Sequence, residues 1–140
     1  MSRVAIVFES HTGTTAAAAE LMAEVVRKAG HECTVTSIHD AEKTRVAGAD
    51  ALCIGTWTKG WFIIGQHPAE GTMAFISDLS LNGKPVAVFA TYKLAAGGTL
   101  RQMANAVESA GGKVTGMYKV KGAKVPDGFE GWVRSIESAA

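Results

Sequence analysis

Residues 4–15, with the sequence VAIVFESHTGTT, decide how this chain folds. The first five are continuously apolar and partly β-branched, which is typical of a parallel strand covered on both faces. A hydroxyl-rich stretch follows, and an alanine-rich segment begins at Ala16. We therefore expect a buried strand, a tight loop and the start of a helix. Such a junction directs unpaired backbone N–H groups and the positive end of a helix dipole at one small volume, so it predicts a phosphate site.

The rest of the chain alternates between strand and helix patterns. Apolar runs or alternations predict four further strands, and three- or four-residue spacing predicts helices on both sides of them. The expected strands cover residues 32–38, 49–56, 85–90 and 114–120, and the expected helices cover residues 16–29, 72–79, 100–110 and a last segment from Pro126. This order predicts an α/β fold with a doubly wound five-stranded parallel sheet. A length of 140 residues suits a single domain, residues 1–140.

Ligands of such sheets bind beyond the carboxyl ends of the strands. Three segments are expected there: residues 10–15, 57–72 and 91–98. The middle segment contains Trp57 and Trp61 between several glycines and a proline, so it is predicted to be a long irregular loop with a function.

The first loop suits a phosphate monoester. Backbone amides of residues 11–15 and the hydroxyls of the loop supply neutral donors, and Gly13 allows close approach. The loop lacks the terminal Gly-Lys of a Walker motif and the glycine triplet of a dinucleotide fingerprint, which argues against nucleoside triphosphates and NAD. The alternative is that its serine and threonines only cap the following helix.

The chain resembles the flavodoxin family over nearly its whole length. The resemblance rests on the S-x-T-G-x-T loop at residues 10–15, on Thr56-Trp57, and on the loop from Tyr92 to Gly98. It implies a strand order of 2-1-3-4-5 and FMN at the switch point between the first and third strands, as the family is known to have. The cofactor-binding residues that it implies are Ser10, His11, Thr12, Gly13, Thr14, Thr15, Thr56, Trp57, Thr58, Lys59, Gly60, Thr91, Tyr92, Leu94, Gly97 and Gly98.

The resemblance assigns Trp57 and Tyr92 to the two sides of the flavin ring. Related domains often have the outer aromatic where Leu94 stands here, and Trp61 is an alternative outer wall. Many flavodoxins have glycine in place of Thr58, so we expect a weaker preference for the one-electron-reduced flavin. Lys59 and Lys93 depart from the acidic character of the family, and they are expected to make the second reduction potential less negative.

These features predict an FMN-binding electron carrier that shuttles electrons from a flavin or iron–sulfur reductase to an acceptor redox enzyme. The alternatives are an FMN-dependent NAD(P)H or quinone reductase and, more weakly, a flavin-free regulatory domain, which would need more acidic residues after the first strand than Glu9. No catalytic or metal-binding residue is assigned: His11 is expected to contribute mainly its backbone N–H, and His67 is expected to be an ordinary loop residue.

The charge and the hydropathy of the chain indicate which classes of partner to expect. A net charge of +1 suggests no nucleic-acid partner, and no apolar run approaches the length of a membrane span. We expect a cytoplasmic monomer. Cys33 and Cys53 are expected to lie on strands that flank the first strand, roughly two spacings of 4.8 Å apart, too far for a disulfide.

Overall fold

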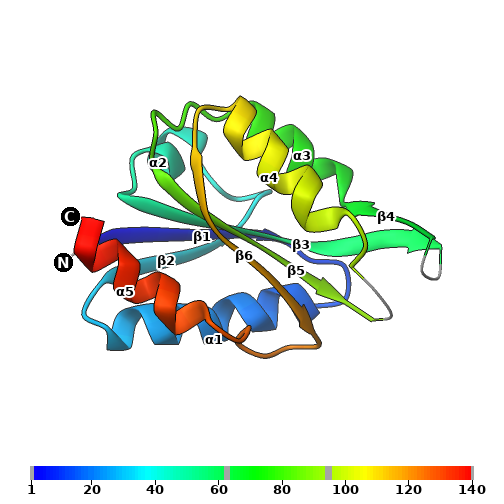
Figure 1. Ribbon diagram of the computed structural model, residues 1–140, viewed down its shortest axis with the longest axis horizontal. Coiled ribbons are helices and arrows are strands. Elements are labelled where there is room, and N and C mark those ends of the chain that lie inside the picture. Colours follow the sequence, from blue (N-terminus) through cyan, green and yellow to red (C-terminus); the bar gives the residue numbers. More distant parts are fainter. Residues whose placement is uncertain (1, 62–63, 94–95, 140) are drawn as a thin grey trace.

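The structure is a computed structural model that describes residues 2–61, 64–93 and 96–139. Strands and helices alternate along most of the chain (Figure 1). The elements are β1 (Arg3–Glu9), α1 (Thr14–Lys28), β2 (Glu32–Ser37), α2 (Lys43–Ala47), β3 (Ala51–Trp61), β4 (Ile64–Pro68), α3 (Glu70–Ser77), β5 (Pro85–Tyr92), α4 (Thr99–Ser109), β6 (Lys113–Lys121) and α5 (Phe129–Ala139).

Five parallel strands form the body of the sheet in the order β2-β1-β3-β5-β6. Counted without β4, this is the order 2-1-3-4-5 that the family resemblance implies, so the parallel α/β prediction is confirmed. A sixth strand, β4, pairs antiparallel with β3 alone, and the sequence did not predict it.

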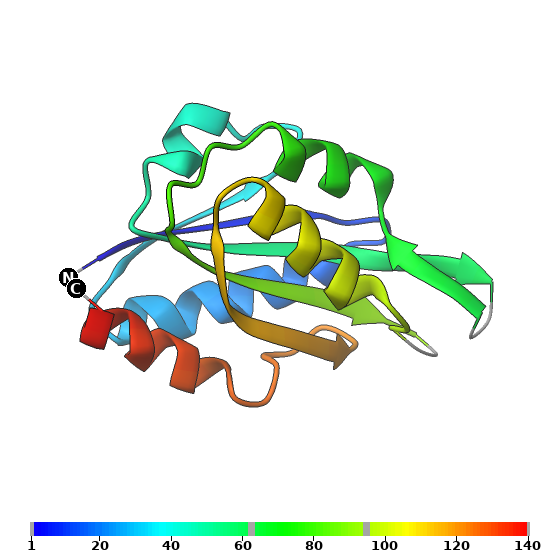
Figure 2. The same cartoon turned by 45° about the horizontal axis from the view of Figure 1, so that its top comes forward.

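Helices cover both faces of the sheet, with α1 and α5 on one face and α2, α3 and α4 on the other (Figures 1 and 2). Alternate residues of β1 pack in the two hydrophobic layers, one on each face of the sheet. Val4 and Ile6 pack with Met22 of α1, whereas Val7 packs in the layer of Met103 from α4. This two-sided burial explains why the first strand is continuously apolar.

The prediction that residues 57–72 form an irregular loop is wrong. β3 continues to Trp61 and the chain returns as β4, with Thr58 paired to Pro68 and Lys59 to His67. Helix α3 accordingly begins at Glu70, two residues earlier than expected. The glycines and proline that suggested a loop are compatible with this hairpin, because its register shifts at a bulge and its proline is the last residue of the strand.

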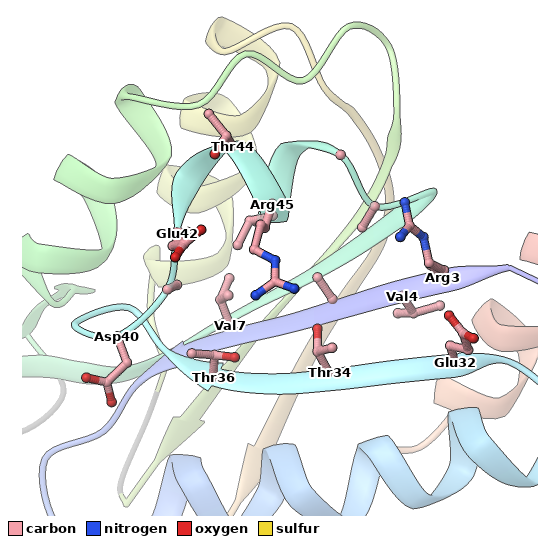
Figure 3. Close-up of a pocket in the computed structure, with 15 residues that line it drawn as sticks. Arg3, Val4, Val7, Glu32, Thr34, Thr36, Asp40, Glu42, Thr44 and Arg45 are labelled. Atoms are coloured by element: carbon pink, nitrogen blue, oxygen red, sulfur yellow. The ribbon is translucent and has the colours of Figure 1, made fainter.

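A groove of about 550 Å³ runs along β1 and β2 beneath α2 (Figure 3). It exists because α2 has only five residues and because small side chains, such as Ala5 and Ala49, form part of the groove lining. Arg45 points into it from α2, and Thr34 and Thr36 line it from β2. None of the sequence-predicted site residues lines this groove.

Candidate functional site

Strand register brings the three predicted segments to one edge of the sheet. Glu9, the last residue of β1, pairs with Thr56 of β3, and Trp57 pairs with Thr91 of β5. The loop of residues 10–15 therefore starts beside the segments that begin at Thr56 and Thr91. These three segments form the candidate site.

The loop after β1 is organised by one of its own side chains. Ser10 Oγ accepts hydrogen bonds from the backbone N–H groups of Gly13 at 3.1 Å and Ala16 at 3.3 Å. Gly13 has φ +91°, in the left-handed region that glycine enters at little cost. A Cβ atom there would meet no atom within 4 Å, so the need for glycine is conformational.

Four other backbone N–H groups point to an anion site at the start of α1. Within residues 2–61, 64–93 and 96–139, those of His11, Thr12, Thr14 and Thr15 donate to no protein acceptor. The first turn of this 15-residue helix carries no acidic residue. Free donors and an uncompensated positive dipole end together favour an anion.

The loop hydroxyls differ in availability. Thr12 is exposed and Thr14 half-buried, with their Oγ1 atoms 3.4 Å apart. Thr15 is buried, and its Oγ1 lies 2.6 Å from that of Thr91. The Thr15 hydroxyl therefore links the start of α1 to the end of β5 in this structure.

Trp57 lies between the loop and the hairpin. Its ring stacks on that of His11, with centroids 4.5 Å apart and an interplanar angle of 23°. Lys59 Nζ lies 5.5 Å from the Trp57 ring centroid and 2.7 Å from Glu70 Oε2. The hydrogen bond from Lys59 lowers the pKa of the exposed Glu70 carboxyl. Trp57 thus supplies an aromatic wall with a cation beside it.

Thr58 and Gly60 lie in the backbone of β3. Among the described non-glycine residues only Asn82 has a positive φ, so Thr58 does not lie in the left-handed region in this structure. The Thr58 hydroxyl is buried and has no hydrogen-bond partner among the residues that the structure describes.

The loop after β5 supplies the remaining predicted residues. Thr91 is buried and Tyr92 half-buried at the end of β5, and Gly98 is the N-cap of α4. Gly97 has φ +54°, and a Cβ atom there would lie 2.7 Å from Gln66 Cβ of β4, so both conformation and space require glycine. Leu94 and the side chain of Trp61 lie outside the described residues.

Sequence reasoning missed two residues beside this site. Glu9 Oε1 accepts hydrogen bonds from the backbone N–H and the hydroxyl of Thr72, at 2.7 Å and 2.8 Å. Thr72 was expected only as the first residue of a helix. The position of Glu9 directly before the loop was the one available signal.

Burial affects the reactivity of both cysteines. Burial raises the pKa of the Cys33 thiol to about 11, and it raises that of Cys53 well above its ordinary value, so neither is a nucleophile near neutral pH. Both cysteines are free. The described residues contain no cluster of three or more potential metal ligands, and no helix among them is long and apolar enough to cross a bilayer.

Solved structures similar to this one include several flavodoxins. The two-electron-reduced flavodoxin of Megasphaera elsdenii is 25% identical, with a TM-score of 0.79 over 98% of this chain and 99% of that one. A short-chain flavodoxin associated with a bacterial microcompartment is 18% identical, with a TM-score of 0.78 over 100% and 99%. The Fusobacterium nucleatum flavodoxin bound to flavin mononucleotide is 14% identical, with a TM-score of 0.70 over 99% of each chain.

A search of curated proteins finds no significant match. The sequence profile of the family described as Flavodoxin, however, matches residues 6–135. That span includes the loop after β1, the wall at Trp57 and the loop after β5. The chain belongs to the flavodoxin family.

Proposed function

We propose that this protein binds FMN at the carboxyl edge of its sheet and carries electrons. The observation that carries the proposal is the group of four unpaired N–H donors at the start of α1, close to the aromatic wall at Trp57. Family membership and the FMN-bound Fusobacterium relative support the same cofactor.

The residues present fit such a cofactor. The loop of residues 10–15 offers backbone donors and the dipole of α1 to a phosphate, without competition from an acidic side chain in the first turn. Trp57 offers a ring for stacking, and Lys59 places a positive charge near it. When bound, FMN supplies one- and two-electron chemistry, while the protein orients it and sets its potentials.

Electron transfer also needs partners. We propose a flavin or iron–sulfur reductase as the donor and a redox enzyme as the acceptor. Membership of the flavodoxin family supports this role.

The hairpin favours a second candidate, an FMN-dependent NAD(P)H or quinone reductase. β4 lies against α4, where the Gln102 side chain donates to the Gln66 carbonyl at 3.3 Å. The hairpin therefore extends the wall of the site beyond the body of the sheet (Figure 2). Such a wall suits the shaping of a small-molecule pocket.

One experiment separates these functions. The purified apoprotein is titrated with FMN while its visible spectrum is recorded, and the complex is then mixed with NADH or NADPH with and without a flavodoxin reductase. A carrier binds FMN stoichiometrically and is reduced only with the reductase present. Steady NAD(P)H oxidation with a quinone alone would favour the enzyme, and a protein that ignores FMN would favour a regulatory role.

A further inference from the structure

A carboxylate that the proposed function does not use lies directly beside the site. Glu9 is half-buried at the end of β1, and its Oε1 receives two hydrogen bonds from Thr72, which is fully buried in the first turn of α3. Hydrogen bonds to an ionised carboxylate are about twice as strong as those between neutral groups. Glu9 therefore ties the strand that precedes the phosphate loop to the helix that follows the hairpin.

The structure is built to accommodate this carboxylate. A Cβ atom at Gly71 would lie 2.8 Å from Glu9 Oε2 and 3.0 Å from Oε1, so glycine leaves the space that the carboxylate fills. Helix α3 has no side-chain cap of its own, since its N-cap is Ala69. Glu9 places from β1 a negative group at this helix N-terminus, in addition to Glu70 in the first turn of the helix.

Further hydrogen bonds connect the start of α3 to Trp57. Thr72 Oγ1 lies 3.1 Å from Thr56 Oγ1, which also accepts the N–H of Ala69 at 3.1 Å and donates to the Trp57 carbonyl at 3.0 Å. A hydroxyl has one proton, and that of Thr72 goes to the stronger acceptor, the carboxylate. The Thr56 proton goes to the Trp57 carbonyl, so the two hydroxyls are in contact without a hydrogen bond between them. The hydrogen bond that links the start of α3 to Thr56 is the one from the Ala69 N–H. Both threonines are 0% exposed, so water does not compete for these bonds.

We infer that Glu9 is a positioning residue: it holds the start of α3 through Thr72, and the start of α3 acts through the Ala69 N–H and Thr56 on the backbone of Trp57. This inference rests on the proposed function, because it assigns Glu9 the task of placing the aromatic wall relative to the phosphate loop. Glu9 is adjacent to Ser10 in sequence and paired with Thr56 in the sheet, so one side chain couples both parts of the cofactor site.

The first test uses the apoprotein and amide hydrogen exchange. Thr72→Val removes the hydroxyl at nearly constant volume, and Thr72→Ser restores it. We expect the Ala69 and Thr72 amides to exchange at least tenfold faster in the valine variant and at wild-type rates in the serine variant. The control is Thr99→Val, since Thr99 is equally buried and its hydroxyl has no hydrogen-bond partner among the described residues. Equal exchange in both valine variants would overturn the inference.

The second test uses the FMN complex. Glu9→Gln and Thr72→Val are expected to weaken FMN binding about tenfold, as loss of one charge-assisted hydrogen bond implies. They should also alter the visible circular dichroism of the bound flavin and its midpoint potentials, whereas the affinity for inorganic phosphate stays unchanged. Thr72→Ser should restore the wild-type values.

Failure of the inference about Glu9 can be distinguished from failure of the proposed function. If the wild-type protein binds FMN but the variants keep its affinity, spectrum and potentials, Glu9 is not a positioning residue and the proposed function survives. If the wild-type protein binds no FMN, the proposed function fails and the assigned task of Glu9 fails with it, although the exchange rates still show whether the Glu9–Thr72 contact exists in solution.

Discussion

The loop after β1 and the hairpin after β3 flank the same site, but different kinds of contact hold them. In the loop, Ser10 Oγ bonds to N–H groups three and six residues away. In the hairpin, Lys59 bonds to Glu70 eleven residues away, and Gln102 bonds to Gln66 across 36 residues. Contacts between residues close in sequence can be inferred from a local sequence pattern. The hydrogen-bond partners of the hairpin residues, in contrast, lie in other elements. The loop was therefore predicted, although α1 begins at Thr14 and not at Ala16, whereas the hairpin was not predicted.

The largest expected effect is on FMN affinity, and it tests the role of Trp57 as the aromatic wall of the site. Trp57→Ala should weaken FMN binding about 100-fold, because an aromatic side chain that stacks on a ligand contributes a large share of its affinity. Fluorescence titration of the apoprotein with FMN measures it. Trp57→Phe should keep most of the affinity, and wild-type affinity in the alanine variant would mean that the wall lies elsewhere.

The next effect tests the local contacts of the loop. Ser10→Ala deprives the N–H groups of Gly13 and Ala16 of their acceptor, so it should lower the free energy of unfolding by about 1 kcal/mol and weaken FMN binding about tenfold. Urea unfolding and FMN titration check both values. The matched control is Ser77→Ala on the exposed side of α3, and equal effects at both serines would contradict a special role for Ser10.

A smaller effect tests the charge beside the wall. Lys59→Glu should lower the second reduction potential by roughly 50 mV, because it replaces a cation near the reduced flavin by an anion. Lys28→Glu makes the same change of charge at the far end of α1, so it serves as the control in the redox titration. A potential that responds equally to both substitutions would place Lys59 away from the flavin.

The smallest effect concerns the ion pair between Lys59 of the hairpin and Glu70 of α3. The pKa of Glu70 should lie below its usual 4.5, because Lys59 stabilises the carboxylate. The Lys59–Glu70 pair therefore contributes to stability at pH values above 4.5, and this contribution is lost as the pH falls through the lowered pKa of Glu70. It should be small, since Glu70 is exposed. Carboxyl NMR titration should show the pKa rising in Lys59→Met, and an unchanged pKa would mean that the pair does not form in solution.

The sequence was sufficient wherever neighbours along the chain decide the structure. Continuous apolarity marked β1 and β5, and the glycine and hydroxyls of residues 10–15 marked the loop. It failed at residues 57–72, where glycines and a proline suggested an irregular segment although pairing between β3 and β4 orders the backbone. It also missed Glu9 and Thr72, whose partnership spans 63 residues.

By itself, the sequence determined the class of fold and predicted where an anion would bind. Both follow from residues close together in the chain, through hydrophobic periodicity and the donors at a helix start. Only the tertiary structure decided the wall of the site: the β3–β4 hairpin, the stacking of Trp57 on His11, and the hydrogen bonds that join Glu9 to Thr72 and Ala69 to Thr56. These depend on strand register, which brings distant residues within hydrogen-bonding distance and is not specified by any local pattern.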